Sequence, residues 1–170
     1  MEVLENFSLK KLNTFGIDVS AKYFSTFNTV DEINELLEFN KLSTVRHQLS
    51  TLVLGGGSNI LFTKNFDGLV LKNEISGIRI IKEDEHYVYV QCGAGENWHQ
   101  FVLYCIHNNF AGVENLSLIP GNVGASPMQN IGAYGVELKE VFYALEAFHL
   151  TEKKTHYFTL NDCEIGRAHV

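Results

Sequence analysis

The sequence predicts a mixed fold of helices and strands, organised as one or two compact units. Two segments carry apolar residues at helical spacing, and several short β-leaning runs end at glycine turns. A length of 170 residues allows one substantial core or two small ones. Because 45% of the residues are hydrophobic and 19% are charged, the composition is that of a globular protein and excludes a largely disordered chain.

The first predicted helix begins beside Thr29. The segment Thr29-Val-Asp-Glu32 is a capping-box pattern, in which a hydroxyl and a carboxylate accept N–H groups at a helix start. Apolar residues then recur at three- and four-residue steps, at Val30, Ile33, Leu36 and Leu37. This spacing predicts an amphipathic helix.

Three short runs predict strands. Thr51–Leu54 is apolar and stops at Gly55-Gly-Gly57, which is typical of a buried strand that leads into a glycine turn. Gly68–Leu71 is a second strand candidate. Tyr87–Val90 is rich in β-branched and aromatic residues, and it too runs into a glycine turn, at Gly93-Ala-Gly95.

A second helix is predicted after that turn and is expected to end near Asn108-Asn109. Its apolar face comprises Trp98, Phe101, Val102, Cys105 and Ile106. Between Asn115 and Gly135 the periodicity fails and glycine and proline recur, so we expect a long ordered loop or a series of turns. Ala144–Leu150 and Thr155–Leu160 flank a polar turn and predict a β-hairpin.

Several classes of function are disfavoured by composition. No apolar run approaches the roughly 18 residues needed to span a bilayer, and the start lacks a signal-peptide core, so a cytoplasmic protein without a membrane partner is expected. The net charge of -7 argues against nucleic acid as a partner. Scattered histidines predict no metal site, and three cysteines without a paired spacing predict buried or neutral thiols, at Cys92, Cys105 and Cys163.

The glycine turn after the first strand is a candidate anion site. Glycines let the backbone turn tightly and present successive N–H groups, a concavity that suits a phosphate or pyrophosphate. The candidate residues are Gly55, Gly56, Gly57, Ser58 and Asn59. A plain tight turn is the alternative, and three glycines alone favour it. The spacing fits neither the dinucleotide fingerprint nor a P-loop.

The loop Leu118–Gly135 is a candidate binding wall. It combines two X-Pro steps and several glycines with amide and hydroxyl side chains, on Asn122, Ser126, Gln129, Asn130 and Tyr134. An elaborate structural loop is the alternative. We favour binding, because so many conformationally special residues interleaved with polar groups can present many donors to one flat ligand.

Five segments, in order, resemble the UDP-N-acetylenolpyruvoylglucosamine reductase (UDP-N-acetylmuramate dehydrogenase) family. They are Asn13–Asp18, Leu54–Phe62, Val90–His99, Gly112–Leu116 and Ile119–Leu138. The resemblance implies an α+β FAD-binding fold of the vanillyl-alcohol-oxidase (PCMH) type. It places two small α/β subdomains, 1–72 and 73–164, around the cofactor, and the substrate domain is expected to be absent.

The resemblance also implies an activity and a cofactor site. The family passes a hydride from NADPH to FAD and then to the enolpyruvyl double bond of a nucleotide sugar, which makes UDP-N-acetylmuramate for peptidoglycan. The first glycine turn would hold the pyrophosphate and the second loop would line the flavin ring. The cofactor residues implied are Gly55, Gly56, Gly57, Ser58, Asn59, Ile119, Pro120, Gly121, Gly124, Ala125, Ser126, Gln129, Asn130, Gly132 and Tyr134. A valine at Gly57 is therefore expected to weaken FAD binding more than a valine at Gly68.

The chain departs from the family pattern at its end. Ala168 stands where the family has an arginine that stabilises charge on the substrate, so Arg167 is not carried over and no catalytic residue is assigned. Residues 165–170 match the translation of a common sequencing-adapter string, so we expect a non-native tail and an inactive chain. Two alternatives remain open: another FAD oxidoreductase of this fold, and a non-catalytic flavin-binding module.

Overall fold

The computed structural model describes residues 2–42 and 50–166. The chain divides into two compact units, unit 1 (Met1–Ile75) and unit 2 (Ser76–Val170). Arg167, Ala168 and most of the expected tail lie outside the described residues.

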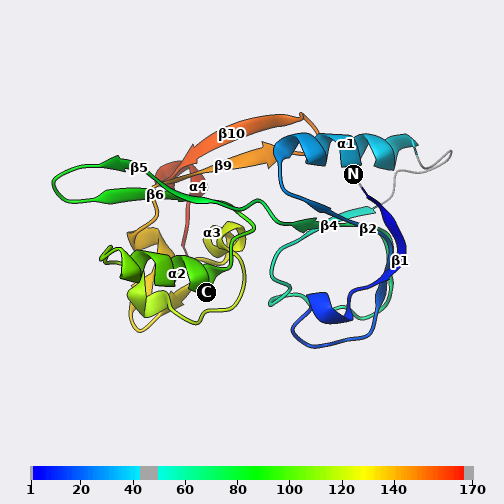
Figure 1. Ribbon diagram of the computed structural model, residues 1–170, viewed down its shortest axis with the longest axis horizontal. Helices are drawn as coiled ribbons and strands as arrows, with labels where there is room; N and C mark the ends of the chain where they lie inside the picture. Colours follow the sequence, from blue (N-terminus) through cyan, green and yellow to red (C-terminus); the bar gives the residue numbers. More distant parts are fainter. Residues whose placement is uncertain (1, 43–49, 167–170) are drawn as a thin grey trace. The chain divides into compact units, whose positions relative to one another are not determined.

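Unit 1 is built on a four-stranded sheet with the order β1-β2-β4-β3 (Figure 1). β2 and β3 both run parallel to the central β4, and β1 pairs antiparallel with β2. The elements in chain order are β1 (Leu4–Ser8), the 3-10 helix η1 (Lys10–Leu12), β2 (Ser20–Phe27), α1 (Val30–Leu42), β3 (Ser50–Leu54) and β4 (Phe66–Asn73).

Strand β2 contributes buried side chains to both faces of the sheet. Its register with β4 shifts between Ala21 and Tyr23, where two residue steps in β2 oppose three in β4, so the extra residue lies in β4. Ala21 and Phe24 of β2 belong to the same core. The buried members of this core are Leu9, Val19, Ala21, Phe24, Leu54, Phe62 and Val70. It lies under η1 and the glycine turn.

Helix α1 covers the other face of this sheet, as Figure 1 shows. Its Phe39 ring meets Tyr23 of β2 edge to face at 6.1 Å, and Ile33, Leu36 and Leu37 are buried as predicted. The cap is also confirmed in part. The Thr29 hydroxyl accepts the Glu32 N–H at 3.2 Å, while the Glu32 carboxylate accepts the N–H of residue 28, one position before the cap.

Unit 2 consists of two-stranded ribbons and short helices around a small core. Its elements are β5 (Ile78–Glu83), β6 (Val88–Cys92), α2 (Trp98–His107), η2 (Glu114–Leu116), η3 (Val123–Ala125), α3 (Ser126–Gln129), β7 (Gly132–Ala133), β8 (Val136–Glu137), η4 (Leu138–Glu140), β9 (Ala144–His149), β10 (Lys154–Thr159) and α4 (Leu160–Cys163). β5 pairs with β6, β7 with β8 and β9 with β10, each antiparallel.

The core of unit 2 forms beneath α2. The buried residues are Trp98, Val102, Cys105, Val113, Leu116 and Leu138. The indole N–H of Trp98 donates to the Leu116 carbonyl at 2.7 Å, so the one polar atom of this ring is satisfied inside the core. The predicted helix and its end at Asn108 are confirmed. Ile106 was expected on the apolar face but is 44% exposed, so that assignment is wrong.

The predicted mixed fold is confirmed, with a second error of burial. The hairpin β9–β10 and the ordered series of turns after Asn115 are present as expected. Thr51–Leu54 does form β3, but this strand is at the edge of its sheet and only partly buried, since Val53 is 45% exposed while Leu54 is 3% exposed. Among the described residues, no helix is both long enough and apolar enough to cross a membrane.

The thiols of Cys92 and Cys105 lie in surroundings that disfavour the thiolate. Burial raises the pKa of Cys105 to about 11, and burial together with the nearby Glu96 carboxylate raises the pKa of Cys92 to about 12. The expectation of neutral thiols is confirmed for these two, and Cys105 is also buried as expected.

A labelling experiment follows from these pKa values. Because the thiolate is the nucleophile, alkylation of Cys92 at pH 8 is expected to be slow and to accelerate about tenfold per pH unit up to its pKa. Mass spectrometry of tryptic peptides would give the rate at each cysteine. The same chain in concentrated urea is the control, and equal rates for Cys92 in both conditions would contradict the expectation.

Candidate functional site

The glycine turn of unit 1 leaves the sheet at the end of β3 and folds back over the core. Gly57 has a positive φ of 68°, a conformation that glycine adopts without strain. Gly57 is buried, Gly55 and Ser58 are half-buried, and Gly56 and Asn59 are exposed. The predicted anion-site residues therefore lie together, with one side of the turn open to solvent.

The backbone N–H groups of Gly56, Gly57, Ser58 and Asn59 have no hydrogen-bond acceptor among the described residues. Gly57 is buried and Ser58 is half-buried, and N–H groups without a partner are rare at such positions in folded proteins. Successive unpaired donors in a tight turn form a concavity that attracts an anion. This observation favours an anion site over a plain structural turn.

Gly57 faces the protein and not the open side of the turn. A Cβ built on it would overlap the Leu12 carbonyl oxygen and lie 2.9 Å from the Leu12 carbonyl carbon. The expectation for Gly57→Val assumed that the valine would restrict the backbone and block the approach of the pyrophosphate. That reason is corrected, because a valine would disrupt the packing of the turn on η1 before it obstructed any ligand. Gly68 is no neutral comparison, because its Cβ would overlap the Ser50 carbonyl oxygen and lie 2.7 Å from the Phe66 ring.

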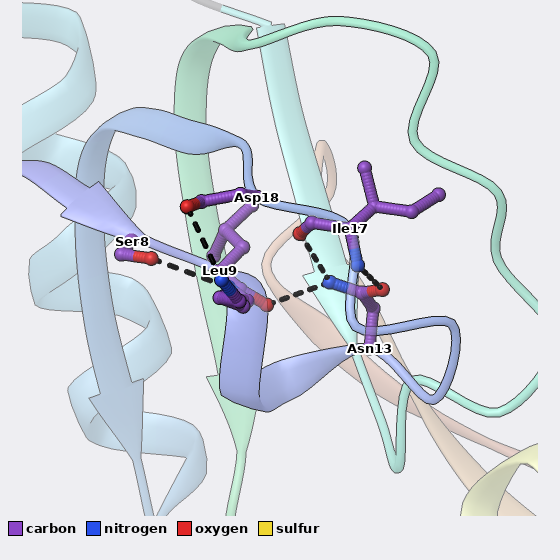
Figure 2. A network of polar contacts seen from close by, with 6 residues as sticks. Ser8, Leu9, Asn13, Ile17 and Asp18 are labelled. Carbon is purple, nitrogen blue, oxygen red and sulfur yellow. Dashed lines mark hydrogen bonds and ion pairs between the residues drawn. The ribbon is translucent and has the colours of Figure 1, made fainter.

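The loop Leu9–Ile17 supports the glycine turn, a relation that the sequence does not reveal. The buried Asn13 side chain donates to the carbonyls of Leu9 (2.8 Å) and Ile17 (3.1 Å), and its Oδ1 accepts the Ile17 N–H at 3.0 Å (Figure 2). The next residue, Thr14, donates its N–H to the Gly57 carbonyl at 3.1 Å. The loop and the turn are thus joined by backbone contacts.

In unit 2 the candidate loop is docked on the second glycine turn. An isolated bridge pairs Asn97 with Asn122, and the Asn122 side chain donates to the Gly95 carbonyl at 2.7 Å. The Gly124 N–H donates to the Ala94 carbonyl at 3.0 Å. A Cβ on Gly124 would lie 2.6 Å from the Ala94 Cβ, so the two turns are in direct contact. The loop is held in one shape without a long strand or helix.

Apolar side chains of this loop are held out into solvent. Leu118 is 76% exposed, and both Met128 and Tyr134 are 89% exposed. Leu118 and Tyr134 also have positive φ values of 64° and 52°, which is uncommon for residues with bulky side chains. Exposed apolar groups on a strained, well-connected loop are typical of a ligand surface.

Two of the three buried polar residues of this loop, Asn130 and Ser126, bind other groups of unit 2 and hold the loop together. Asn130 is 1% exposed and has a left-handed backbone. Its Nδ2 donates to the Glu137 carboxylate at 2.9 Å, and its Oδ1 accepts the Lys139 N–H at 3.2 Å. The Ser126 hydroxyl donates to the Val123 carbonyl at 2.7 Å. Both side chains are therefore directed at protein groups.

The remaining candidates lie on the accessible side of the loop. Pro120, Gly124, Gln129 and Tyr134 are exposed, and Ile119, Gly121, Ala125 and Gly132 are half-buried. The N–H groups of Ile119, Gly121 and Asn122 have no acceptor among the described residues. A shallow hollow is lined by Trp98, Pro120, Gly121, Asn122, Ala125, Ser126, Gln129 and Ile131. Within 2–42 and 50–166, no group of three or more His, Cys, Asp or Glu residues is placed to hold a metal ion.

Known proteins share this architecture. The chain is 48% identical to the UDP-N-acetylenolpyruvoylglucosamine reductase of Flavobacterium johnsoniae, over 98% of this chain and 48% of that protein. It is also 48% identical to the protein of that name from Amoebophilus asiaticus, over 96% of this chain and 47% of that protein. The chain thus spans about half the length of the curated relatives it matches.

A solved structure and a family model agree on the fold. The crystal structure of UDP-N-acetylenolpyruvylglucosamine reductase from Thermus caldophilus matches 94% of this chain and 52% of its own, with a TM-score of 0.69 and 22% identity. At that identity the likeness shows the fold alone, and the predicted α+β FAD-binding fold is confirmed. A model described as "FAD binding domain" matches residues 21–150. The chain therefore belongs to the FAD binding domain family.

Proposed function

We propose that this chain is the FAD-binding part of a UDP-N-acetylenolpyruvoylglucosamine reductase. The observation that carries the proposal is the row of unpaired N–H groups at Gly56–Asn59, in a chain 48% identical to reductases of that name. The row fits the diphosphate of a dinucleotide, because an anion needs donors and this turn offers them without a cationic patch. The overall net charge of -7 makes such local donors necessary.

In unit 1, the proposed role of the turn is to bind the pyrophosphate. Gly56, Gly57, Ser58 and Asn59 would donate backbone N–H groups, and the Ser58 hydroxyl and Asn59 amide would add side-chain hydrogen bonds. Gly55 would set the turn as it leaves β3. The two units are proposed to correspond to the two FAD-binding subdomains expected from the sequence.

In unit 2, the proposed role of the loop is to line the flavin ring. Its exposed and half-buried members offer accessible surface, and the N–H groups of Ile119 and Gly121 have no acceptor among the described residues. These members are Ile119, Pro120, Gly121, Gly124, Ala125, Gln129, Gly132 and Tyr134. Ser126 and Asn130, whose side chains bind protein groups, would contribute by fixing the shape of this surface.

The reaction proposed for the whole protein is a reduction. When bound, FAD would accept a hydride from NADPH and deliver it to the enolpyruvyl group of a nucleotide sugar, giving UDP-N-acetylmuramate for peptidoglycan. The residues described above would bind the cofactor, orient its ring and keep water from the ring face. The proposed location is the cytoplasm, where NADPH and nucleotide sugars are available.

Two other functions fit the same fold: reduction of a different substrate, and flavin binding without turnover. The identity to the reductases over nearly the whole chain favours the enolpyruvyl substrate over another one. The exposed apolar loop fits all three functions, so it does not separate them.

An absorbance spectrum of the purified chain, after incubation with FAD and desalting, tests the proposal. About one oxidised flavin per chain is expected, and a chain that retains no flavin would overturn it. Anaerobic NADPH, followed by the enolpyruvyl nucleotide sugar, then tests the chemistry. Bleaching and substrate-dependent recovery of the flavin band support the reductase, while a bound flavin that NADPH does not bleach supports the non-catalytic module.

A further inference from the structure

The orientation of one peptide plane decides which group the glycine turn offers to an anion. In a trans peptide the carbonyl of residue 57 and the N–H of residue 58 point in opposite directions. The Gly57 carbonyl accepts the Thr14 N–H at 3.1 Å, and the Thr14 hydroxyl lies 3.4 Å from the same oxygen. The Ser58 N–H is therefore directed away from the Leu9–Ile17 loop, where it has no acceptor among the described residues.

Glycine does not enforce this orientation of the 57–58 peptide, so another contact must hold it. Gly57 can adopt several backbone conformations, so the 57–58 peptide can turn over and present its carbonyl in place of the Ser58 N–H. A carbonyl oxygen facing an anion would repel it. The Thr14 hydrogen bond opposes that flip, and the Leu12 backbone packed against Gly57 leaves no room for the turn to shift.

The orientation of the 57–58 peptide depends on a side chain that does not belong to the turn. Asn13 is 6% exposed and makes the three hydrogen bonds that close the Leu9–Ile17 loop. Its backbone is extended, with φ -135° and ψ 138°, and this sets the direction in which the Thr14 N–H points. Without the amide, the carbonyls of Leu9 and Ile17 each lose a donor and the Ile17 N–H loses its acceptor, so the loop is held by backbone hydrogen bonds alone.

We propose that Asn13 is a positioning residue for the ligand-facing N–H groups of the glycine turn. It acts through Thr14 on the Gly57 carbonyl, and it touches no ligand itself. The inference rests on the proposed function, since it takes the pyrophosphate of FAD as the anion. It adds a residue outside the turn to the determinants of cofactor affinity.

The test compares Asn13→Ala with a variant of similar stability loss elsewhere in unit 1. Leu36→Ala in α1 is the match, because Leu36 is fully buried on the opposite face of the sheet. FAD affinity is measured by flavin fluorescence, with inorganic pyrophosphate as the competitor, and urea unfolding gives the stability of each variant.

The expected result is a loss of FAD affinity of about tenfold or more in Asn13→Ala, equivalent to ~1.4 kcal/mol. Pyrophosphate should compete more weakly by a similar factor, while Leu36→Ala stays within about twofold of the parent chain. Equal losses in Asn13→Ala and Leu36→Ala would show a general stability effect and overturn the inference. Unchanged affinity in Asn13→Ala would do the same.

Two further outcomes are separable. If Asn13→Ala does not fold, Asn13→Ser replaces it, because its hydroxyl can still make one of the three hydrogen bonds without burying a charge, and a smaller loss of affinity in the same direction is expected. If the parent chain binds neither FAD nor pyrophosphate, the proposed function fails, and that result is distinct from a parent that binds and an Asn13 variant that binds equally well.

Discussion

Replacing Gly57 with alanine is expected to unfold unit 1 or to destabilise it severely. Two effects add. Alanine at a φ of 68° carries strain of roughly 1–2 kcal/mol, and its Cβ overlaps the Leu12 backbone, where overpacking costs about 1–3 kcal/mol or more. Gly57 cannot move away from Leu12 without disturbing the hydrogen bond between its carbonyl and the Thr14 N–H, so the overlap is not easily relieved.

Gly16 provides a matched control for this variant. Its φ of 63° is nearly the same as that of Gly57, but a Cβ on it would have no atom within 4 Å. Gly16→Ala therefore carries the backbone strain alone. Urea unfolding of both variants isolates the steric part, and Gly57→Ala should lose at least about 1 kcal/mol more than Gly16→Ala. Equal losses would mean that the turn is not packed on η1 as described.

The largest effect in unit 2 is expected for Trp98→Ala. The ring is 2% exposed at the centre of the core under α2, and removing it leaves a cavity and an unsatisfied Leu116 carbonyl. Changes of this kind typically cost about 3–5 kcal/mol. We expect unit 2 to lose cooperative unfolding, measured by far-UV circular dichroism during urea titration.

Two comparisons make the Trp98 prediction specific. Trp98→Phe loses the N–H but keeps an aromatic ring, so it leaves a smaller cavity. It should therefore lower the free energy of unfolding less than Trp98→Ala does. Ile106→Ala removes a 44% exposed side chain from the same helix and should cost no more than about 1 kcal/mol. An Ile106 variant as damaged as Trp98→Ala would place the core on the wrong face of α2.

The elements with regular patterns were predictable, and the missed strands show why others were not. The helices starting after Thr29 and Asn97 carry clear periodicity and caps, so local sequence decides them. β2 and β5 were not predicted. β5 contains an extra residue between Ile80 and Lys82 that breaks its alternation, and in β2 the adjacent residues Phe24 and Ser25 are both buried, so neither strand shows a simple alternation. β1 is largely exposed and carries no apolar pattern. The edge position of β3 depends on strand order, which its own residues do not encode.

The candidate site was predictable as two segments but not as a network. Glycine and proline spacing identified the turn at Gly55 and the loop before Gly135, because unusual backbone conformations restrict residue choice. The support from Asn13 could not be found in this way, since it depends on a contact across 43 residues of chain between Thr14 and Gly57. Likewise, nothing local to Asn130 distinguishes an amide that binds Glu137 from one that faces a ligand.

The contact between Gly124 and Ala94 has an evolutionary consequence. The two positions have too little space for two methyl groups, so a side chain gained at 124 is acceptable only if 94 becomes smaller or its turn moves. Substitutions at the two sites are therefore conditional on each other, and their free energies should not be additive. Even a glycine at 94 would leave its carbonyl oxygen 3.0 Å from a Cβ at 124, so compensation is partial. Among proteins that descend from this sequence, we therefore expect positions 94 and 124 to change together or to stay unchanged together.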